Sequence, residues 1–233
     1  RCLELAPDFT LARLNYAQLL SKRERLEQAE VEVDHLLRED PSRYAFLSLR
    51  ASLLVKRGDF VAAETHARSA MQLEEIIPGV SDSEVIARYY LGKALSKQNR
   101  WDDAQEVLIR AVEQLQEPQF QQNIEPLIQV KLALAMVYYE QRDLERAERC
   151  FFDQCNDIER LVGRQSTTYA HWLELLVAVY ESHHDFEKAS ERQLERATLL
   201  RDLGQLNEAA QELSHAATLF EKRHQFERAD QLH

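Results

Sequence analysis

The chain has 233 residues, of which 45% are hydrophobic and 30% are charged, and its formal net charge is −11 at pH 7. Such an acidic balance disfavours a nucleic-acid groove as the main function, because phosphates require a basic surface. With only 5 glycines and 5 prolines, the chain lacks the turns and phosphate loops of mixed α/β enzymes, so its composition favours helices joined by short turns.

The apolar periodicity predicts six pairs of helices, taken here in chain order. The first three pairs are expected at 9–22 with 26–38, 43–56 with 60–75, and 83–98 with 101–115. The last three are expected at 124–141 with 144–161, 167–183 with 186–202, and 206–222 with 226–233. Two connections are longer: 76–83 ends in good N-cap residues, and 116–126, with two prolines, either bulges as a loop or extends the neighbouring helices.

An alanine recurs near the start of each second helix, at Ala29, Ala63, Ala104, Ala147, Ala189 and Ala229. Twelve residues earlier stand mostly small residues: Ala17, Ala51, Gly92, Ala135, Val177 and Ala217. Large apolar residues stand nine and three residues before each alanine. Two antiparallel helices approach closely only where side chains are small, so this spacing predicts tight helix pairs. Such pairs must stack on their neighbours to bury their apolar faces.

This pattern resembles the tetratricopeptide repeat, a 34-residue helix–turn–helix unit, most clearly over residues 10–41 and 85–112. The resemblance implies an all-α fold, a right-handed α-α superhelix (a tetratricopeptide-like solenoid) of about six antiparallel helix pairs. We expect one domain over residues 1–233, with repeats at about 9–41, 43–75, 83–116, 124–161, 167–203 and 206–233. From the third repeat on, the period lengthens to 40–43 residues. Long-helix variants in kinesin light chains, cell-polarity adaptors and bacterial signal-responsive regulators are similar.

In this family the first helix of each pair lines a concave groove, and the resemblance assigns ten residues of this chain to it. In the first three repeats these are Lys22, Lys56, Tyr89, Lys93 and Lys97. In the last three they are Tyr139, Glu140, Glu174, Glu181 and Glu221. A groove that runs from basic to acidic would orient a partner segment with one acidic and one basic end. Ordinary solvated helix faces are the alternative reading of the same residues.

Aromatic side chains are a second class of candidate, because aromatic residues in grooves are common binding anchors. The candidates for exposed aromatics are Tyr89, Tyr90, Tyr139, Tyr169 and Trp172. Packing between repeats is the alternative role for each of them. The family's two-carboxylate clamp for chaperone tails is incomplete here: Asn15, Lys93 and Lys97 are its nearest residues, whereas Gln18, Ser48 and Ser52 occupy other clamp positions. We therefore do not expect this chain to bind a chaperone tail.

No catalytic, nucleotide-binding or metal-binding motif is found, so we expect no enzyme activity, no cofactor and no metal. The cysteines Cys2, Cys150 and Cys155 form no CxxC pair and fit neither a disulfide scaffold nor a zinc site. Reduced thiols and the lack of a visible signal peptide favour a cytoplasmic location. No run of about 18 apolar residues predicts a membrane span.

Together these features predict a non-catalytic scaffold or adaptor that binds a peptide or helix of a partner protein, without direct nucleic-acid binding. Two alternatives stay open: a sensory or regulatory domain of a larger signalling or transcription-regulating protein, and an accessory array of a fused transferase. Because the chain starts at Arg1 and not at Met, we interpret it as a fragment of a longer one. Homodimerisation through the terminal helices is a further expectation, since exposed terminal repeats need a cover.

Overall fold

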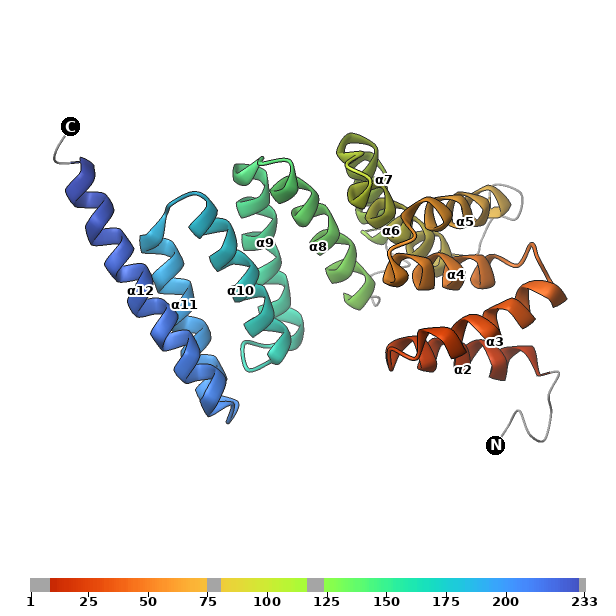
Figure 1. The fold of residues 1–233 in the computed structure, drawn as a ribbon, viewed down its shortest axis with the longest axis horizontal. Coiled ribbons are helices and arrows are strands. Elements are labelled where there is room, and N and C mark those ends of the chain that lie inside the picture. The colour runs from red at the N-terminus through yellow and green to blue at the C-terminus, as the bar shows by residue number, and fades with distance from the viewer. Residues whose placement is uncertain (1–8, 75–80, 117–123, 231–233) are drawn as a thin grey trace. The chain divides into compact units, whose positions relative to one another are not determined.

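The computed structural model describes residues 9–74, 81–116 and 124–230, and every regular element in these ranges is an α-helix (Figure 1). The all-α repeat fold expected from the sequence is thereby confirmed. The chain divides into two compact units, residues 1–133 and 134–233. Each unit is described by itself. No helix in the described ranges is both long and apolar enough to cross a membrane.

Unit 1 is built from consecutive antiparallel helix pairs. Its helices are α2 (Thr10–Lys22), α3 (Leu26–Glu39), α4 (Tyr44–Arg57), α5 (Phe60–Glu74), α6 (Ser81–Lys97), α7 (Trp101–Leu115) and the N-terminal part of α8 (Ile124–Glu140). The helices of each pair pack on one another, and α4 also packs on α3 and α6. In the first pair, Ala17 and Leu20 of α2 share a buried cluster with Ala29 and Val33 of α3.

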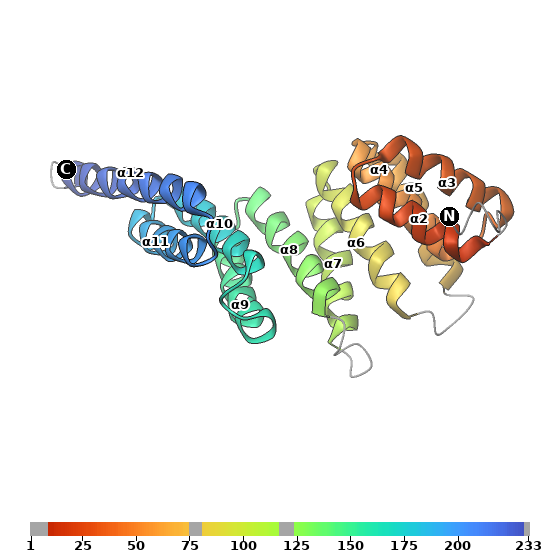
Figure 2. The ribbon, with the colours of Figure 1, turned by 90° about the horizontal axis from the view of Figure 1, so that it is seen from below.

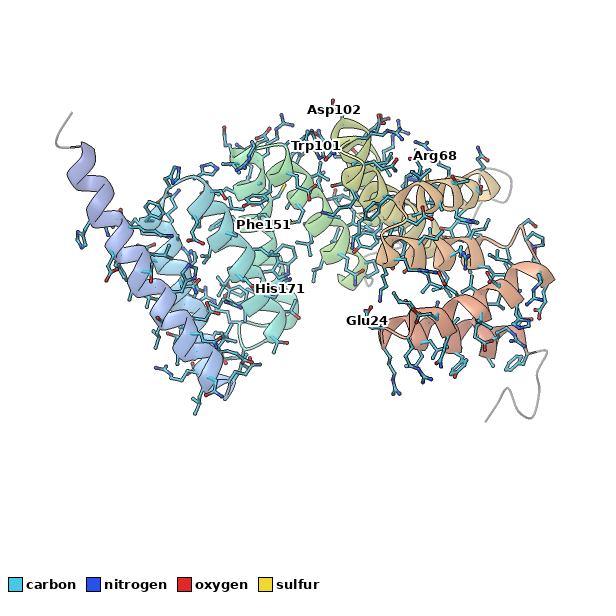
Figure 3. All side chains as sticks on the ribbon, viewed as in Figure 1. Glu24, Arg68, Trp101, Asp102, Phe151 and His171 are labelled. Atoms are coloured by element: carbon cyan, nitrogen blue, oxygen red, sulfur yellow. The ribbon has the colours of Figure 1, made fainter. Side chains whose placement is uncertain are left out.

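Unit 2 continues the same alternation from the C-terminal part of α8 onward. Its further helices are α9 (Leu144–Val162), α10 (Thr167–Ser182), α11 (Phe186–Asp202) and α12 (Leu206–Asp230). Helix α10 packs between α9 and α11, and α11 packs on α12 (Figure 2). Phe151 of α9 and Trp172 of α10 meet with their ring centroids 5.7 Å apart (Figure 3).

In the five complete pairs, the small residues predicted to hold the helices together are buried. Ala29, Ala63, Ala104, Ala147 and Ala189 are completely shielded from solvent, whereas the side chain of Ala229 lies outside the described residues. Gly92 marks an especially close approach, because a Cβ there would lie 2.5 Å from Cγ of Leu108 on the paired helix. The repeated spacing therefore predicted the helix contacts as well as the helices.

The turn inside each complete pair has the same backbone geometry. Two residues before the second helix stands a residue of positive φ: Glu24, Gly58, Asn99, Arg142 or His184. The next backbone N–H donates to the carbonyl five residues earlier, as Asp59 does to Leu54 at 3.0 Å and Asp143 to Tyr138 at 2.9 Å. This hydrogen bond is that of the Schellman motif, which ends a helix at a left-handed residue. The acceptors are the same large apolar residues that recur nine residues before each alanine.

The sixth predicted pair is wrong. Residues 206–222 and 226–233 were expected as two helices, whereas the structure has one helix, α12, of 25 residues from Leu206 to Asp230. Residues 231–233 lie outside the described ranges. Lys222, Arg223, His224 and Gln225 are all tolerated inside a helix.

Candidate functional site

A cavity of about 480 Å³ opens in unit 1, and four helices contribute to its wall. Helices α2, α4 and α6 are the first helices of successive pairs, and the N-terminal part of α8 follows them. Residues spaced by four share one face of a helix. Accordingly α2 contributes Gln18 and Lys22, and α4 contributes Ser48, Ser52 and Lys56. The cavity thus lies along the helix faces that the sequence assigned to the groove.

Lysines surround this cavity. Lys22 and Lys56 line it, and the Nζ of Lys56 donates to the carbonyl of Ser21 at 2.7 Å. The same Nζ pairs with Glu24, at the turn after α2, at 2.9 Å (Figure 3). Lys93 lies one turn beyond Tyr89 on α6. Burial lowers its pKa, and the positive charges of Lys97 and Lys56 lower it further. These lysines form one positively charged cluster within an acidic chain.

Two neighbouring tyrosines of α6 form part of the same wall. The rings of Tyr89 and Tyr90 meet edge to face with centroids 4.9 Å apart. The Nζ of Lys93 lies 5.3 Å from the centroid of the Tyr89 ring and 3.4 Å from its hydroxyl. Burial raises the pKa of Tyr90, although a hydrogen bond with Ser52 opposes this. Both phenols are therefore neutral at physiological pH and can donate hydrogen bonds.

Ser48 offers a further polar group at the cavity wall. The residue is only 4% exposed, and its Oγ has no hydrogen-bond partner among the described residues. A hydroxyl that is buried without a partner costs free energy, on the order of 1–3 kcal/mol. The apolar side chains of Leu49, Val85 and Val130 complete this part of the wall. Ser48 thus lies at the cavity wall with an unused hydrogen-bonding capacity, although its Oγ is itself shielded from solvent.

Three of the groove residues predicted in unit 2, Tyr139, Glu174 and Glu181, pair with side chains of neighbouring helices. The hydroxyl of Tyr139 shares a hydrogen bond of 2.8 Å with Ser182. Glu174 pairs with Arg196 at 2.9 Å and with His171 at 3.4 Å (Figure 3), and Glu181 accepts from His215 at 3.3 Å. Glu140 is half-buried and Glu221 is exposed. None of these five predicted residues contributes to the cavity of about 330 Å³ that Tyr169, Leu194 and Glu195 help to form.

Two of the aromatic residues predicted to be exposed binding anchors are buried, so the prediction is wrong for them. Trp172 is 1% exposed and packs against Phe151, and Tyr169 is buried with its hydroxyl donating to Glu195 at 2.9 Å. Both point into the unit 2 core because α10 packs between two other helices and has little free surface. No group of three or more potential metal ligands occurs among the described residues.

A comparison with protein families adds the deciding observation. Residues 44–69, which form most of α4 and α5, match the family model described as "Tetratricopeptide repeat". Residues 44–69 thus form a recognisable tetratricopeptide repeat within a tetratricopeptide-like fold. No curated protein matches it.

Solved structures of other tetratricopeptide-like proteins share the fold. BtubC from P. vanneervenii is 21% identical with a TM-score of 0.59, covering 99% of this chain and 93% of its own. YrrB, described as a protein of this family with an unusual peptide-binding site, is 20% identical with a TM-score of 0.53, covering 86% of this chain and 91% of its own. A Rap protein complexed with competence and sporulation factor is 15% identical with a TM-score of 0.67, covering 94% of this chain and 70% of its own.

Some residues at the unit 1 cavity were not predicted as site residues. Lys22, Lys56 and Tyr89 were predicted and line it, whereas Tyr44 and the α8 residue Gln129 were not. Ser48 was considered only because it departs from the chaperone clamp. Extending the face of Lys56 backward by steps of four residues leads to Ser52 and Ser48, so that signal was present. Gln129 gives no comparable signal, because nothing in the local pattern places α8 beside α4.

Proposed function

We propose that unit 1 binds a segment of a partner protein in the 480 Å³ cavity, and that this segment presents carboxylates to the lysines. The supporting observation is that Lys22, Lys56 and Tyr89 line one cavity formed by first helices, and that Lys93 lies against the ring of Tyr89. Tetratricopeptide-repeat folds typically serve as protein-binding scaffolds. The reported peptide-binding site of YrrB is in keeping with this role.

The cavity wall suggests how such a segment is held. A carboxylate near Lys93 gains a charge-assisted hydrogen bond, which is stronger than one between neutral groups. A backbone carbonyl can accept from the unpartnered Oγ of Ser48. An apolar side chain of the ligand fits against Leu49, Val85 and Val130. The expected ligand is therefore a short segment with an apolar residue flanked by Asp or Glu.

We confine this proposal to unit 1. In unit 2, Glu174 and Glu181 already form ion pairs with side chains of neighbouring helices. We further propose that the protein acts without catalysis of its own, in the cytoplasm, and without binding nucleic acid directly. The support for these points is the repeat fold, the absence of metal-ligand clusters among the described residues, and the net charge of −11.

The test reverses the charge of two lysines together, Lys93→Glu with Lys97→Glu. A matched control, Arg110→Glu with Arg149→Glu, changes the net charge equally at exposed positions on the second helices α7 and α9. Partners are captured from native cell extract with each variant and identified by mass spectrometry. Thermal melting checks that both variants stay folded.

The lysine variant is expected to lose specific partners that the unmodified chain and the control retain, with its melting temperature nearly unchanged. An unchanged set of partners would contradict the proposed site. For a partner segment identified in this way, fluorescence anisotropy with the synthetic peptide is expected to show at least tenfold weaker binding to the lysine variant. Binding of the peptide to the unmodified chain should weaken as salt is added, because salt screens an electrostatic contact.

A further inference from the structure

Helix α12 carries an exposed stripe of apolar residues. Leu206, Leu213 and Phe220 are 65%, 53% and 36% exposed, and Ala210 and Ala217 between them are exposed as well. The spacing alternates between four and three residues, which keeps all five side chains on one narrow strip of the helix surface. These five residues are called the α12 stripe below.

The stripe is separate from the face by which α12 joins unit 2. Ala209, Ala216 and Leu219 are buried, and Glu212 forms an ion pair with Arg196 of α11. Both ribbon views show α12 at the edge of unit 2, with α11 along one side of it (Figures 1 and 2). The helix is thus docked by one face and presents the stripe on another.

The repeat pattern shows what this surface is built to contact. In the complete pairs, the positions equivalent to Ala217 and Phe220 pack against the second helix of the pair. The residues equivalent to Phe220 are Leu20, Leu54, Leu95, Tyr138 and Tyr180, and each is at most 7% exposed. Since α12 runs on as one helix, no second helix covers the same surface of the sixth repeat among the described residues. It therefore has the shape and composition of a helix-binding face.

We propose that the α12 stripe packs against the same stripe of a second copy of this chain, with the two helices antiparallel. In one register the two stripes interdigitate. Phe220 of each copy then lies opposite Ala210 of the other, Leu213 opposite Ala217, and Leu206 opposite His224. Each large side chain on this stripe meets a smaller partner or a flat ring, which is the arrangement that fills a helix interface without voids. The pair then has two-fold symmetry, as most homodimers do, and the axis passes level with His215.

Polar residues beside the stripe fit the antiparallel arrangement. Glu221 follows the stripe on its exposed flank, and in this register it lies opposite Asn207 of the other copy, whose amide can donate to the carboxylate. Ser214 lies opposite its own counterpart, and no carboxylate faces another. In a parallel pair, Phe220 would oppose Phe220 and Ala217 would oppose Ala217. The large residues would then clash with one another, and the small residues would leave gaps.

The size of the contact predicts a weak, reversible dimer. From Leu206 to Phe220 the stripe extends about 21 Å along the helix, at 1.5 Å per residue. An interface of this length lies at the small end of specific protein contacts, so we expect a dissociation constant on the order of 10 µM. The oligomeric state should therefore depend on concentration within an easily measured range.

The first test is sedimentation velocity of the whole chain from about 1 to 300 µM, a range chosen to bracket the expected constant. The unmodified chain should pass from monomer to dimer, and Leu213→Glu should remain a monomer throughout. The matched control is Leu194→Glu, an equally drastic change at a 37% exposed residue on α11, which should dimerise normally. A monomeric unmodified chain, or a Leu213→Glu variant that still dimerises, would overturn the proposal. Circular dichroism confirms the helix content of each variant.

The second test addresses the register. Ala217→Leu adds apolar surface, so it would strengthen a merely adhesive patch. In the proposed register it instead places Leu against Leu213 and should weaken the dimer at least fivefold. In a chain whose native cysteines are replaced by alanine, mixing Leu213→Cys with Ala217→Cys protein should give mainly the mixed disulfide. Stronger dimerisation of Ala217→Leu, or a majority of like-with-like disulfides, would overturn the antiparallel arrangement.

Discussion

At the scale of single residues, the closest contact between paired helices lies at Gly92. An added Cβ would come within 2.6 Å of two carbons of the Leu108 side chain. Leu108 is itself fully buried, so it has little room to move away. The glycine therefore serves the approach of α6 to α7, even though glycine is a poor residue inside a helix, by about 1 kcal/mol relative to alanine.

Gly92→Ala is expected to destabilise the protein by about 1–2 kcal/mol, because the clash with Leu108 outweighs the gain in helix propensity. In a Leu108→Ala background the same change should become neutral or stabilising, since the space is then empty. Urea unfolding of the four proteins in this double-mutant cycle provides the measurement. Equal effects of Gly92→Ala in both backgrounds would show that the two residues are not coupled.

Tyr180 gives a prediction about alkaline stability. Burial, together with the nearby Glu148 carboxylate, raises its pKa from 10.0 to about 12. The folded state thus holds the phenol proton more tightly than the unfolded chain does. The stability from this group is fully present below pH 10 and is lost as the pH rises toward 12.

Replacing Tyr180 by Phe should therefore flatten the fall in unfolding free energy between pH 10.0 and about 12, a window set by the two pKa values. The control is Tyr16→Phe, at an exposed tyrosine of α2. Urea denaturation followed by circular dichroism at several pH values measures both slopes. If Tyr180→Phe and Tyr16→Phe lose stability in parallel with the unmodified chain, Tyr180 does not contribute to the alkaline transition.

At the scale of elements, one backbone device recurs in all five complete pairs: the left-handed residue of the Schellman turn. It is occupied by glycine only once, at Gly58, and otherwise by Glu, Asn, Arg or His. A side chain at positive φ costs about 1 kcal/mol. His224 holds the equivalent position in the sixth repeat but is part of the continuous helix α12.

The same substitution should therefore have opposite effects at the two kinds of position. Arg142→Gly relieves the positive φ and should stabilise the protein by about 0.5–1 kcal/mol. His224→Gly places glycine inside a helix and should destabilise α12 by about 0.5–1 kcal/mol. Thermal melts and amide exchange in α12 measure these changes. Stabilisation by His224→Gly would indicate that the helix breaks there after all.

Most helix boundaries could be predicted because the spacing of alanine and large apolar residues repeats with each turn. The predicted and observed ends of α4 differ by one residue, 43–56 against Tyr44–Arg57. The break in the sixth repeat was predicted from the same signal, Phe226 followed by Ala229, and failed. Residues 222–225 are all tolerated inside a helix, and the spacing alone does not reveal that the helix continues through them. The cavity residues on α8 were missed for a related reason, since they depend on contacts between elements distant in sequence.

At the scale of the whole molecule, each helix contacts mainly its sequence neighbours, as in other repeat proteins. The unfolding free energy of such an array is close to the sum of contributions from each repeat and from the contacts between neighbouring repeats. Trp172 is the largest fully buried side chain, and it lies in unit 2. Its loss should therefore be felt mainly by the helices that pack around it.

Trp172→Ala is expected to cost about 3–5 kcal/mol locally. Amide hydrogen exchange of the full chain should show faster exchange in α9 to α11, whereas α2 to α5 keep the protection of the unmodified protein. The matched change in unit 1 is Phe46→Ala, another fully buried aromatic, which should give the reverse pattern. Equal loss of protection in both units would indicate that the chain unfolds as a single cooperative block.

The cavity of unit 1 has a consequence for how binding could be transmitted. Its wall is contributed by α2, α4, α6 and the start of α8, one helix from each of four successive repeats. A segment that touches α2 and α8 together can bind only at one spacing of the repeats between them. Binding would then favour the one arrangement of these repeats that fits the segment. In this way a short peptide could report its presence over a distance much greater than its own length.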